Sequence, residues 1–290
     1  MCGNGRAGVE GEGMGAMVLR LIVSDKYGAF RIPQTHPPSD WKDACFRIKK
    51  AVPDPILQGS PVKAAVIVFP GSNCDRDVAV ALEASMGAKP HMVWHRDTDL
   101  PAVDLIVVPG GFSYGDYLRC GAMAAHSPIM REVKARAAKG TRVLGICNGF
   151  QVITEAGLLP GVLMRNKNLK FICKDVFLKV ENDRTDFCRY YRAGDVVRFP
   201  IAHAEGNYFV EPHLFREMED NGQIAFRYAS ADGKVNDATN PNGSLGNVAG
   251  VYNDKFNVLG LMPHPERLAE DLLGGADGKL MFDSLVEALS

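Results

Sequence analysis

The sequence lacks an excess of either charge, because 33 lysines and arginines face 34 aspartates and glutamates and leave a net charge of −1. Without a basic surplus the chain has little means of neutralising nucleic-acid phosphates, so we expect no nucleic acid as a partner. Long apolar runs are also missing. The longest early run, residues 18–23, contains Arg20 and is far shorter than the roughly 18 residues of a membrane span. We therefore expect neither a membrane partner nor a secretory signal.

Paired metal-binding or disulfide motifs are missing as well. The seven cysteines form an odd set without a Cys-x-x-Cys pair or a paired histidine spacing. This pattern indicates free thiols in a reducing cytoplasm, with no disulfide framework and no metal site. Phosphate-binding motifs are weak: residues 3–8 match a dinucleotide fingerprint by letter, but no strand pattern precedes them and no helix pattern follows. We expect no cofactor on this chain.

Residues 1–61 differ in composition from the rest of the chain. Six glycines stand among the first sixteen residues, and six prolines lie between positions 33 and 61. Such a segment buries too little apolar surface to offset its ordering entropy. The sequence therefore predicts a poorly ordered extension over residues 1–61 and a folded domain over residues 62–290.

From Lys63 onward, short apolar runs alternate with stretches at helical spacing. Buried strands are predicted at residues 64–69, 105–108 and 143–146, a further strand at 91–94, and helices between the strands, including one over about 122–138. This alternation favours an α/β fold with a doubly wound, mostly parallel, flavodoxin-like sheet.

Beyond residue 175 the pattern changes to strands with few helices. The runs at 176–180, 196–199, 224–226 and 248–251 predict an antiparallel flap before residues 258–262 return to the main sheet. A last helix, 277–289, is expected to begin with Asp277 as its cap.

Cys147 is the strongest candidate for a nucleophile. It lies in Gly145-Ile146-Cys147-Asn148-Gly149, where a buried strand is predicted to turn into a helix. Small residues on both sides leave room for the strained turn of a nucleophile elbow. The amides at a helix N-terminus favour a thiolate, and the N–H of Asn148 can stabilise an oxyanion. The alternative is a buried cysteine acting as a small hydrophobe.

His264 is the candidate base for this thiol. It stands in Met262-Pro263-His264-Pro265-Glu266, just past the strand at 258–261, and should share the carboxyl edge of the sheet with Cys147. In an extended segment residues two apart share a face, so Glu266 can orient the imidazole. A surface turn is the alternative reading of this segment. Other bases that would have to be considered are His91, His95, His126 and His203.

The glycine turn at residues 110–111 and the remaining cysteines are further candidates for a chemical role. Gly110 and Gly111 end another buried strand and can offer a second backbone N–H to an oxyanion, although Pro-Gly-Gly is also a common turn. The remaining thiols, at positions 74, 120, 173 and 188, have no base beside them in the sequence and are interpreted as structural.

These motifs resemble the class I (triad) glutamine amidotransferases and, more closely, the glutaminase subunits of phosphoribosylformylglycinamidine synthases. The resemblance runs from about Lys63 to the C-terminus and rests on the segments at 69–75, 109–119, 145–151, 165–166, 170–173 and 262–267. It departs from the family at Ala204, where the family usually has glycine. Because the family begins near Lys63, one hypothesis is a mis-assigned start, with translation beginning at Val62. A flexible tail or a docking arm that uses Trp41 and Phe46 are the alternatives.

The resemblance implies a glutamine amidotransferase domain over 62–290 with Cys147, His264 and Glu266 as its triad. It also implies an oxyanion hole formed by backbone N–H groups of Gly110, Gly111 and Asn148, and Gln151 as a contact for glutamine. The expected partners are glutamine, a large synthetase subunit that uses ATP and magnesium, and a small bridging subunit of the same complex. The location implied is cytoplasmic.

Two other functions remain open at this point. A stand-alone cysteine hydrolase or thiol-stress protein of related fold would need no partner. A non-catalytic scaffold subunit would only support a synthetase.

Overall fold

The computed structural model of the chain describes residues 61–290. The extension predicted for residues 1–61 lies outside the described residues except for Pro61, so it stays a prediction. Within residues 61–290, no helix has the length and apolar character needed to cross a membrane.

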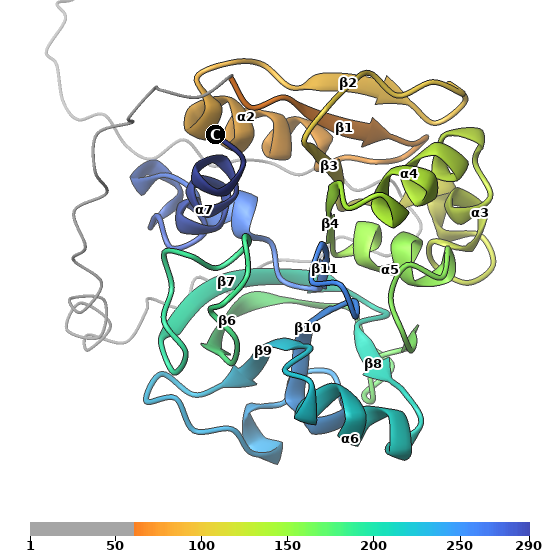
Figure 1. Cartoon of the computed structure of the whole chain (residues 1–290). Helices are drawn as coiled ribbons and strands as arrows, with labels where there is room; N and C mark the ends of the chain where they lie inside the picture. Colours follow the sequence, from red (N-terminus) through yellow and green to blue (C-terminus); the bar gives the residue numbers. More distant parts are fainter. Residues whose placement is uncertain (1–60) are drawn as a thin grey trace, which may run out of the picture. The chain divides into compact units, whose positions relative to one another are not determined.

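Helices and strands alternate in the first half of the described chain, and strands dominate the second half (Figure 1). The strands are β1 (Ala64–Val68), β2 (His91–Trp94), β3 (Leu105–Val108), β4 (Arg142–Ile146), β5 (Val162–Met164), β6 (Ile172–Val180), β7 (Val196–His203), β8 (Asn207–Phe209), β9 (Ile224–Ala229), β10 (Val248–Tyr252) and β11 (Val258–Leu261). The α-helices are α2 (Asp75–Met86), α3 (Ala122–Ala125), α4 (Pro128–Ala138), α5 (Asn148–Glu155), α6 (Pro212–Asp220) and α7 (Lys279–Leu289). The 3₁₀ helices are η2 (Ser113–Asp116), η3 (Asp237–Thr239), η4 (Leu245–Asn247), η5 (Pro265–Leu268) and η6 (Asp271–Leu273).

Five strands form the parallel half of a nine-stranded sheet. Their order is β2-β1-β3-β4-β11, and each neighbouring pair is parallel. This is the strand order of the flavodoxin-like doubly wound fold. Strands β3 and β11 are buried throughout, which explains their continuous apolar runs in the sequence. The predicted α/β fold with a parallel, doubly wound sheet is confirmed.

The antiparallel strands extend this same sheet. Strand β10 pairs antiparallel with β11, and β9, β6 and β7 follow it in order. The predicted flap is therefore continuous with the main sheet. Alternate residues of β7 are buried, as expected for a strand with one face on the core. The sequence analysis missed helix α6 and the small two-stranded sheet of β5 and β8.

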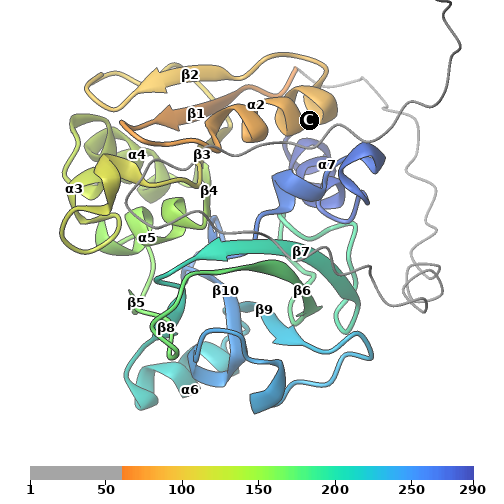
Figure 2. The same cartoon turned by 180° about the vertical axis from the view of Figure 1, so that it is seen from behind.

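Helices cover both faces of the parallel strands. Figures 1 and 2 show α2 and α7 together on one side of β4, and α4 and α5 on the other. Right-handed crossovers require this arrangement when the strand order reverses at β1. The loops that follow β1, β3, β4 and β11 then meet at one edge, the carboxyl edge, where ligands bind in such sheets.

Two helix predictions were wrong in detail. The helix expected over 122–138 is divided into α3 and α4, with Pro128 in the first turn of α4. Proline has no N–H to continue α3 but fits the first turn of a new helix. The last helix begins at Lys279, because the carboxylate of Asp277 accepts the N–H of Arg198 at 2.8 Å and does not cap the helix.

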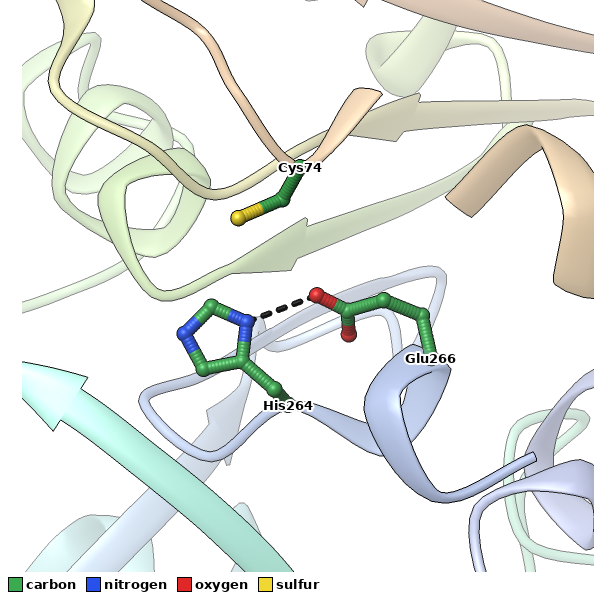
Figure 3. Close-up of side chains that lie close together, drawn as sticks. All are labelled: Cys74, His264 and Glu266. Carbon is green, nitrogen blue, oxygen red and sulfur yellow. Dashed lines mark hydrogen bonds and ion pairs between the residues drawn. The ribbon is translucent and has the colours of Figure 1, made fainter. Parts of the chain in front are cut away.

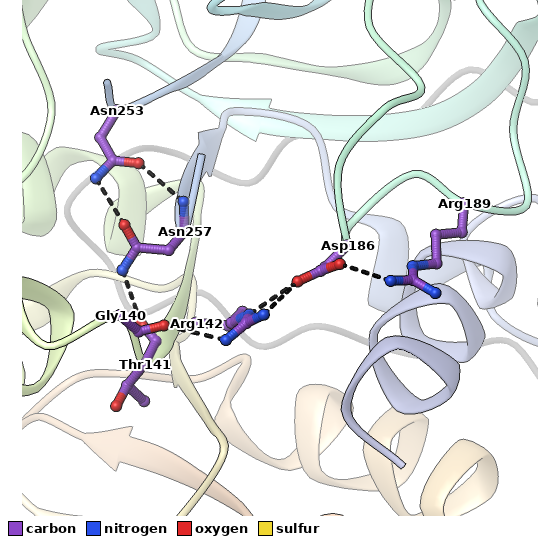
Figure 4. Close-up of polar contacts among 7 residues, drawn as sticks. All are labelled: Gly140, Thr141, Arg142, Asp186, Arg189, Asn253 and Asn257. Atoms are coloured by element: carbon purple, nitrogen blue, oxygen red, sulfur yellow. Dashed lines mark hydrogen bonds and ion pairs between the residues drawn. The ribbon is translucent and has the colours of Figure 1, made fainter. Parts of the chain in front are cut away.

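Polar contacts fasten the opposite, amino ends of the central strands. Arg142, at the start of β4, donates to Asp186 at 2.7 and 2.9 Å (Figure 4). Asn257, just before β11, donates to the carbonyl of Thr141 at 2.9 Å and accepts from Asn253 at 3.0 Å. These contacts tie β4 and β11 together at the edge away from Cys147, which leaves the carboxyl edge for chemistry.

The start of α5 packs directly on β3 and β4 because glycine stands at two positions. A Cβ at Gly149 would overlap the carbonyl oxygen of Val108. A Cβ at Gly145 would lie 2.5 Å from Cδ1 of Ile153 and 2.9 Å from the carbonyl oxygen of Gly149. Helix and strand ends thus approach more closely than side chains would permit.

Gly149→Ala should lower the free energy of unfolding by about 3 kcal/mol or more, because only a backbone shift can relieve the overlap with Val108. The matched control is Gly87→Ala at the end of α2, where φ is 70° and no atom lies within 4 Å of an added Cβ. That control should lose only about 1 kcal/mol, for the left-handed backbone. Chemical denaturation measures both. Equal losses of unfolding free energy in the two variants would contradict the prediction, because α5 would then move away from Val108 without cost.

Candidate active site

Cys147 occupies the turn between β4 and α5 with φ 51° and ψ −107°. A positive φ is uncommon for a non-glycine residue and costs on the order of 1–3 kcal/mol. The close packing of Gly145 and Gly149 holds it there, and its own N–H donates to the carbonyl of Leu261 at 2.8 Å. The strand-to-helix turn predicted around Cys147 is therefore present and is fastened to β11.

His264 and Glu266 follow β11 and form a buried pair. Nδ1 of His264 lies 2.6 Å from Oε1 of Glu266, and each residue is only 2% exposed (Figure 3). The sequence predicts an extended segment from His264 to Glu266. In the structure η5 begins at Pro265, so Glu266 lies in a 3₁₀ helix. The N–H of His264 donates to the carbonyl of Pro200 at 2.9 Å. The two side chains meet as expected, by a different backbone path.

Charge and burial act in opposite directions on His264. Burial disfavours the imidazolium, but the carboxylate of Glu266 together with the two neighbouring thiols outweighs it, and the pKa of His264 is raised well above its usual value. The two thiols are those of Cys147 and Cys74. Nε2 of the ring makes no ordinary hydrogen bond to residues 61–290. A positive imidazole beside Cys147 stabilises the negative charge that a sulfur nucleophile carries.

The glycine turn after β3 closes on this pair. A Cβ at Gly110 would lie 2.8 Å from Cε1 of His264, so only glycine fits there. Gly111 has φ 135°, which also favours glycine. In the hydrogen bonding of residues 61–290, the N–H groups of Gly110, Gly111 and Asn148 have no acceptor. The side-chain oxygen of Asn148 accepts the N–H of Ser113 at 3.1 Å and ties α5 to the turn. These three N–H groups are available to an oxyanion.

Gln151, one turn into α5, has both ends of its amide engaged. Its oxygen accepts from Asn148 at 2.9 Å, and its nitrogen donates to the carbonyl of Glu205 at 2.6 Å. The side chain is buried and connects α5 to the loop after β7. Its contact with glutamine stays a prediction. The geometry gives it a second role, in fixing that loop.

Two carboxylates beside this loop were missed by the sequence analysis. Asp116 accepts from the side chain of Asn148 at 3.4 Å, and Glu205 accepts the N–H of Cys120 at 3.4 Å. Burial raises the pKa of Asp116 to about 6, and the neighbouring Glu205 raises it as well. Burial and these carboxylates also raise the pKa of Cys120 far above its usual value. The segment Gly115-Asp116-Tyr117 carried no sequence signal for this role, because the contact depends on the fold.

No base stands near Cys74 in the sequence, but the fold places the imidazole of His264 beside its sulfur. Cys74 precedes α2 at the carboxyl end of β1, and its sulfur faces His264 (Figure 3). Arg267 donates to this sulfur at 3.0 Å and also pairs with Asp77 at 3.4 Å. Only the parallel pairing of the sheet, which places the ends of β1 and β11 at one edge, could have revealed this neighbour.

Cys74, His264 and Glu266 offer possible metal ligands within 4.8 Å of one another. Their other contacts do not suit a cation. The carboxylate of Glu266 is already 2.6 Å from the imidazole nitrogen, closer than about 3.3 Å, the spacing of two donors on one zinc ion. The guanidinium of Arg267 also lies against the sulfur. The donor chemistry favours a proton-transfer pair over a metal centre.

The loop after β7 rests on a buried histidine. Nδ1 of His203 lies 3.1 Å from Oδ1 of Asn166, and Asn166 donates to the carbonyl of His203 at 2.9 Å. Burial lowers the pKa of His203 to about 3, and the positive charge of His264 lowers it too. His203 is thus neutral at physiological pH, and its contacts hold the loop. Ala204 is exposed and has no positive φ, so alanine fits this loop without strain.

His203 makes stability depend on pH. Its pKa is about 3 in the folded chain and about 6.5 when unfolded. The unfolded state therefore binds more protons between these values, and the free energy of unfolding falls as pH falls. Relative to His203→Gln, the wild type should lose up to about 1.4 kcal/mol per pH unit between about pH 6 and 4.

Denaturant unfolding over a pH series measures this difference in slope. His213→Gln, at an exposed position of α6, is the matched control and should keep the wild-type slope, because its side chain stays in water. If the unfolding free energies of wild type and His203→Gln changed equally with pH, His203 would not be the buried neutral group described above.

The comparison with protein families gives one match over most of the described chain. The family of CobB/CobQ-like glutamine amidotransferase domains matches residues 61–274. Subunit PurQ of phosphoribosylformylglycinamidine synthase from Bradyrhizobium diazoefficiens is 56% identical over 229 residues, covering 79% of this chain and 98% of that protein. The PurQ subunit from Rhodopseudomonas palustris is 54% identical over 230 residues, covering 79% and 99%.

A solved structure agrees with these relatives. A chain in the structure of PurLQS from Thermotoga maritima is 44% identical to this chain, with a TM-score of 0.71, and the match covers 80% of this chain and 100% of that one. The family resemblance drawn from the sequence motifs is confirmed. This chain belongs to the family of PurQ subunits of phosphoribosylformylglycinamidine synthase, within the glutamine amidotransferases.

Proposed function

We propose that this chain is the glutaminase subunit of a phosphoribosylformylglycinamidine synthase and serves de novo purine biosynthesis. It hydrolyses glutamine and passes ammonia to a separate synthetase subunit. One observation carries the proposal: the strained Cys147 and the buried His264–Glu266 pair lie together at the carboxyl edge of the sheet. Family membership supplies glutamine as the substrate.

In the first half of the reaction, the sulfur of Cys147 attacks the side-chain amide carbon of glutamine. The carbonyl oxygen becomes an oxyanion, which accepts the free N–H groups of Asn148 and the Gly110-Gly111 turn. His264 gives a proton to the departing ammonia, and a glutamyl thioester remains on the sulfur.

In the second half, His264 takes a proton from water, which attacks the thioester and releases glutamate. Glu266 holds the imidazole by its 2.6 Å contact and stabilises the positive charge at each stage. Because both residues are buried, their mutual attraction is little screened by solvent.

The charge around the site suits an amino-acid substrate. Asp116 and Glu205 place two carboxylates beside α5, and Arg165 lies 3.7 Å from Glu205 at the exposed rim. An α-ammonium group would offset both the burial and the repulsion from Glu205 that raise the pKa of Asp116. Gln151, held between Asn148 and Glu205, is the proposed contact for the remainder of glutamine.

The proposed partners are a large ATP-dependent synthetase subunit and a small bridging subunit. Support comes from the match to a chain of PurLQS and from apolar side chains left exposed by the glycine turn. Phe112 is 45% exposed and stacks with Phe171, which is 51% exposed. ATP and magnesium belong to the synthetase in this proposal, and this chain binds no cofactor. Such a biosynthetic complex is expected in the cytoplasm.

The two other functions are less well supported. A scaffold subunit would have no use for a strained cysteine beside a buried imidazole–carboxylate pair, which are costly to maintain. A stand-alone hydrolase would not need the exposed Phe112 and Phe171, and the family of PurQ subunits does not favour it.

Cys147→Ala in the assembled complex should reduce glutamine-dependent product formation on the order of 10³-fold or more, because the thioester cannot form. Ammonium salt should still support synthesis at the wild-type rate, because this chain only supplies ammonia and the synthetase subunit carries out the rest of the reaction. A coupled assay with each nitrogen source makes the measurement. Equal loss with both sources would assign the thiol a structural role. Cys188→Ser is the control and should retain both activities, because the thiol of Cys188 is hydrogen-bonded to the hydroxyl of Tyr252 and is not part of the proposed site.

His264→Ala should lose nearly as much glutamine-dependent activity as Cys147→Ala, because it removes the base. Glu266→Gln keeps a hydrogen-bonding side chain of the same size and should lose at least about tenfold less than His264→Ala. Initial rates of glutamate release at saturating glutamine compare the three variants. Wild-type turnover in His264→Ala would exclude it as the base.

A further inference from the structure

A second thiol stands beside the nucleophile. The sulfur of Cys74 and the Cβ of Cys147 lie 3.3 and 3.4 Å from one point, the position that a Cβ at residue 110 would occupy. Because residue 110 is glycine, that position holds no side chain. Both thiols also interact with the ring of His264. The sulfur of Cys74 and the Cβ of Cys147 therefore approach the same position beside the ring of His264, although 73 positions separate the two cysteines in the sequence.

The contacts of Cys74 do not fix it in a structural role. It stands at the N-cap of α2 but makes no side-chain hydrogen bond to the helix. Its other partners are the guanidinium of Arg267 at 3.0 Å and the side-chain oxygen of Asn73 at 3.7 Å. Burial raises the pKa of Cys74 above its ordinary value, and His264 and Arg267 offset only part of this rise. The guanidinium at 3.0 Å and the imidazole of His264 stabilise the thiolate that forms when this sulfur acts as a nucleophile.

We propose that Cys74 is a resolving cysteine that forms a reversible disulfide with Cys147 when hydrogen peroxide oxidises the nucleophile. In the first step the thiolate of Cys147 attacks one peroxide oxygen, the O–O bond breaks, and sulfenic acid and hydroxide form. In the second step the thiolate of Cys74 attacks that sulfur, the S–O bond breaks, and hydroxide leaves. Overall, each sulfur loses one electron, hydrogen peroxide accepts the two electrons, and the two hydroxides take up the two thiol protons to give two water molecules.

The disulfide would stop glutamine hydrolysis because no thiolate remains at residue 147. It would also protect the nucleophile, since sulfenic acid that meets no thiol can proceed to sulfinic and sulfonic acids, which thiol reductants do not reverse. Hydrogen peroxide is smaller than an amide substrate, so a Cys147 that any such substrate reaches is also within reach of peroxide. This inference requires a reactive Cys147 but not the identity of its substrate, so its test does not depend on the glutaminase assay.

Peptide mapping of the full chain under non-reducing conditions tests the proposal directly. Trypsin releases Cys74 in residues 64–76 and Cys147 in residues 143–165, and each peptide contains one cysteine. After peroxide treatment, wild type should show these two peptides linked, and dithiothreitol should separate them. Cys74→Ser should show no such link and should carry Cys147 as sulfinic or sulfonic acid, which dithiothreitol does not restore.

Cys120→Ser is the matched control, because Cys120 is the other buried thiol near the site, beside Glu205. It should form the Cys74–Cys147 link to the wild-type extent. A link from Cys147 to Cys120, or to any cysteine other than Cys74, would overturn the proposal. So would overoxidation of Cys147 at equal rates in wild type and Cys74→Ser. If Cys74→Ser fails to fold, the wild-type map alone decides between the link and overoxidation.

Discussion

The register of β4 between β3 and β11 is the constraint on which the candidate site depends. Gly145 lies opposite Val108 on one side and opposite Gly260 on the other. This pairing brings the ends of three strands to one level, so the residues that follow them meet at one edge. A shift of any strand by one residue would reverse the direction of its side chains and separate Cys147 from His264, its proposed base.

The close approach at that edge requires missing side chains. Gly149 must contact the carbonyl of Val108, and Gly110 must contact the ring of His264. A Cβ at either position would lie too close to these neighbouring atoms, so a larger residue does not fit. The cost is conformational entropy in the unfolded chain, and the gain is a cysteine held at a positive φ beside an imidazole.

The electrostatics of the site follow from burial at the same place. His264 and Glu266 are both almost free of solvent, so the energy of their contact is large and each would be costly alone. His203 is buried nearby without a carboxylate, and its pKa moves in the opposite direction. One residue type is therefore held in its charged form at one position and in its neutral form at the other.

The sequence by itself determined the family, the parallel half of the sheet, the turn at Cys147 and the pair of His264 and Glu266, because local patterns carry each of them. It did not reveal that Cys74 faces His264, that Asp116 lies near Glu205, or that the antiparallel strands continue the main sheet. It also placed the start of the last helix at Asp277, whose carboxylate binds the N–H of Arg198. These are contacts between segments far apart in the chain. Only the tertiary structure decides them, since they depend on strand order and on which glycines let the backbone close.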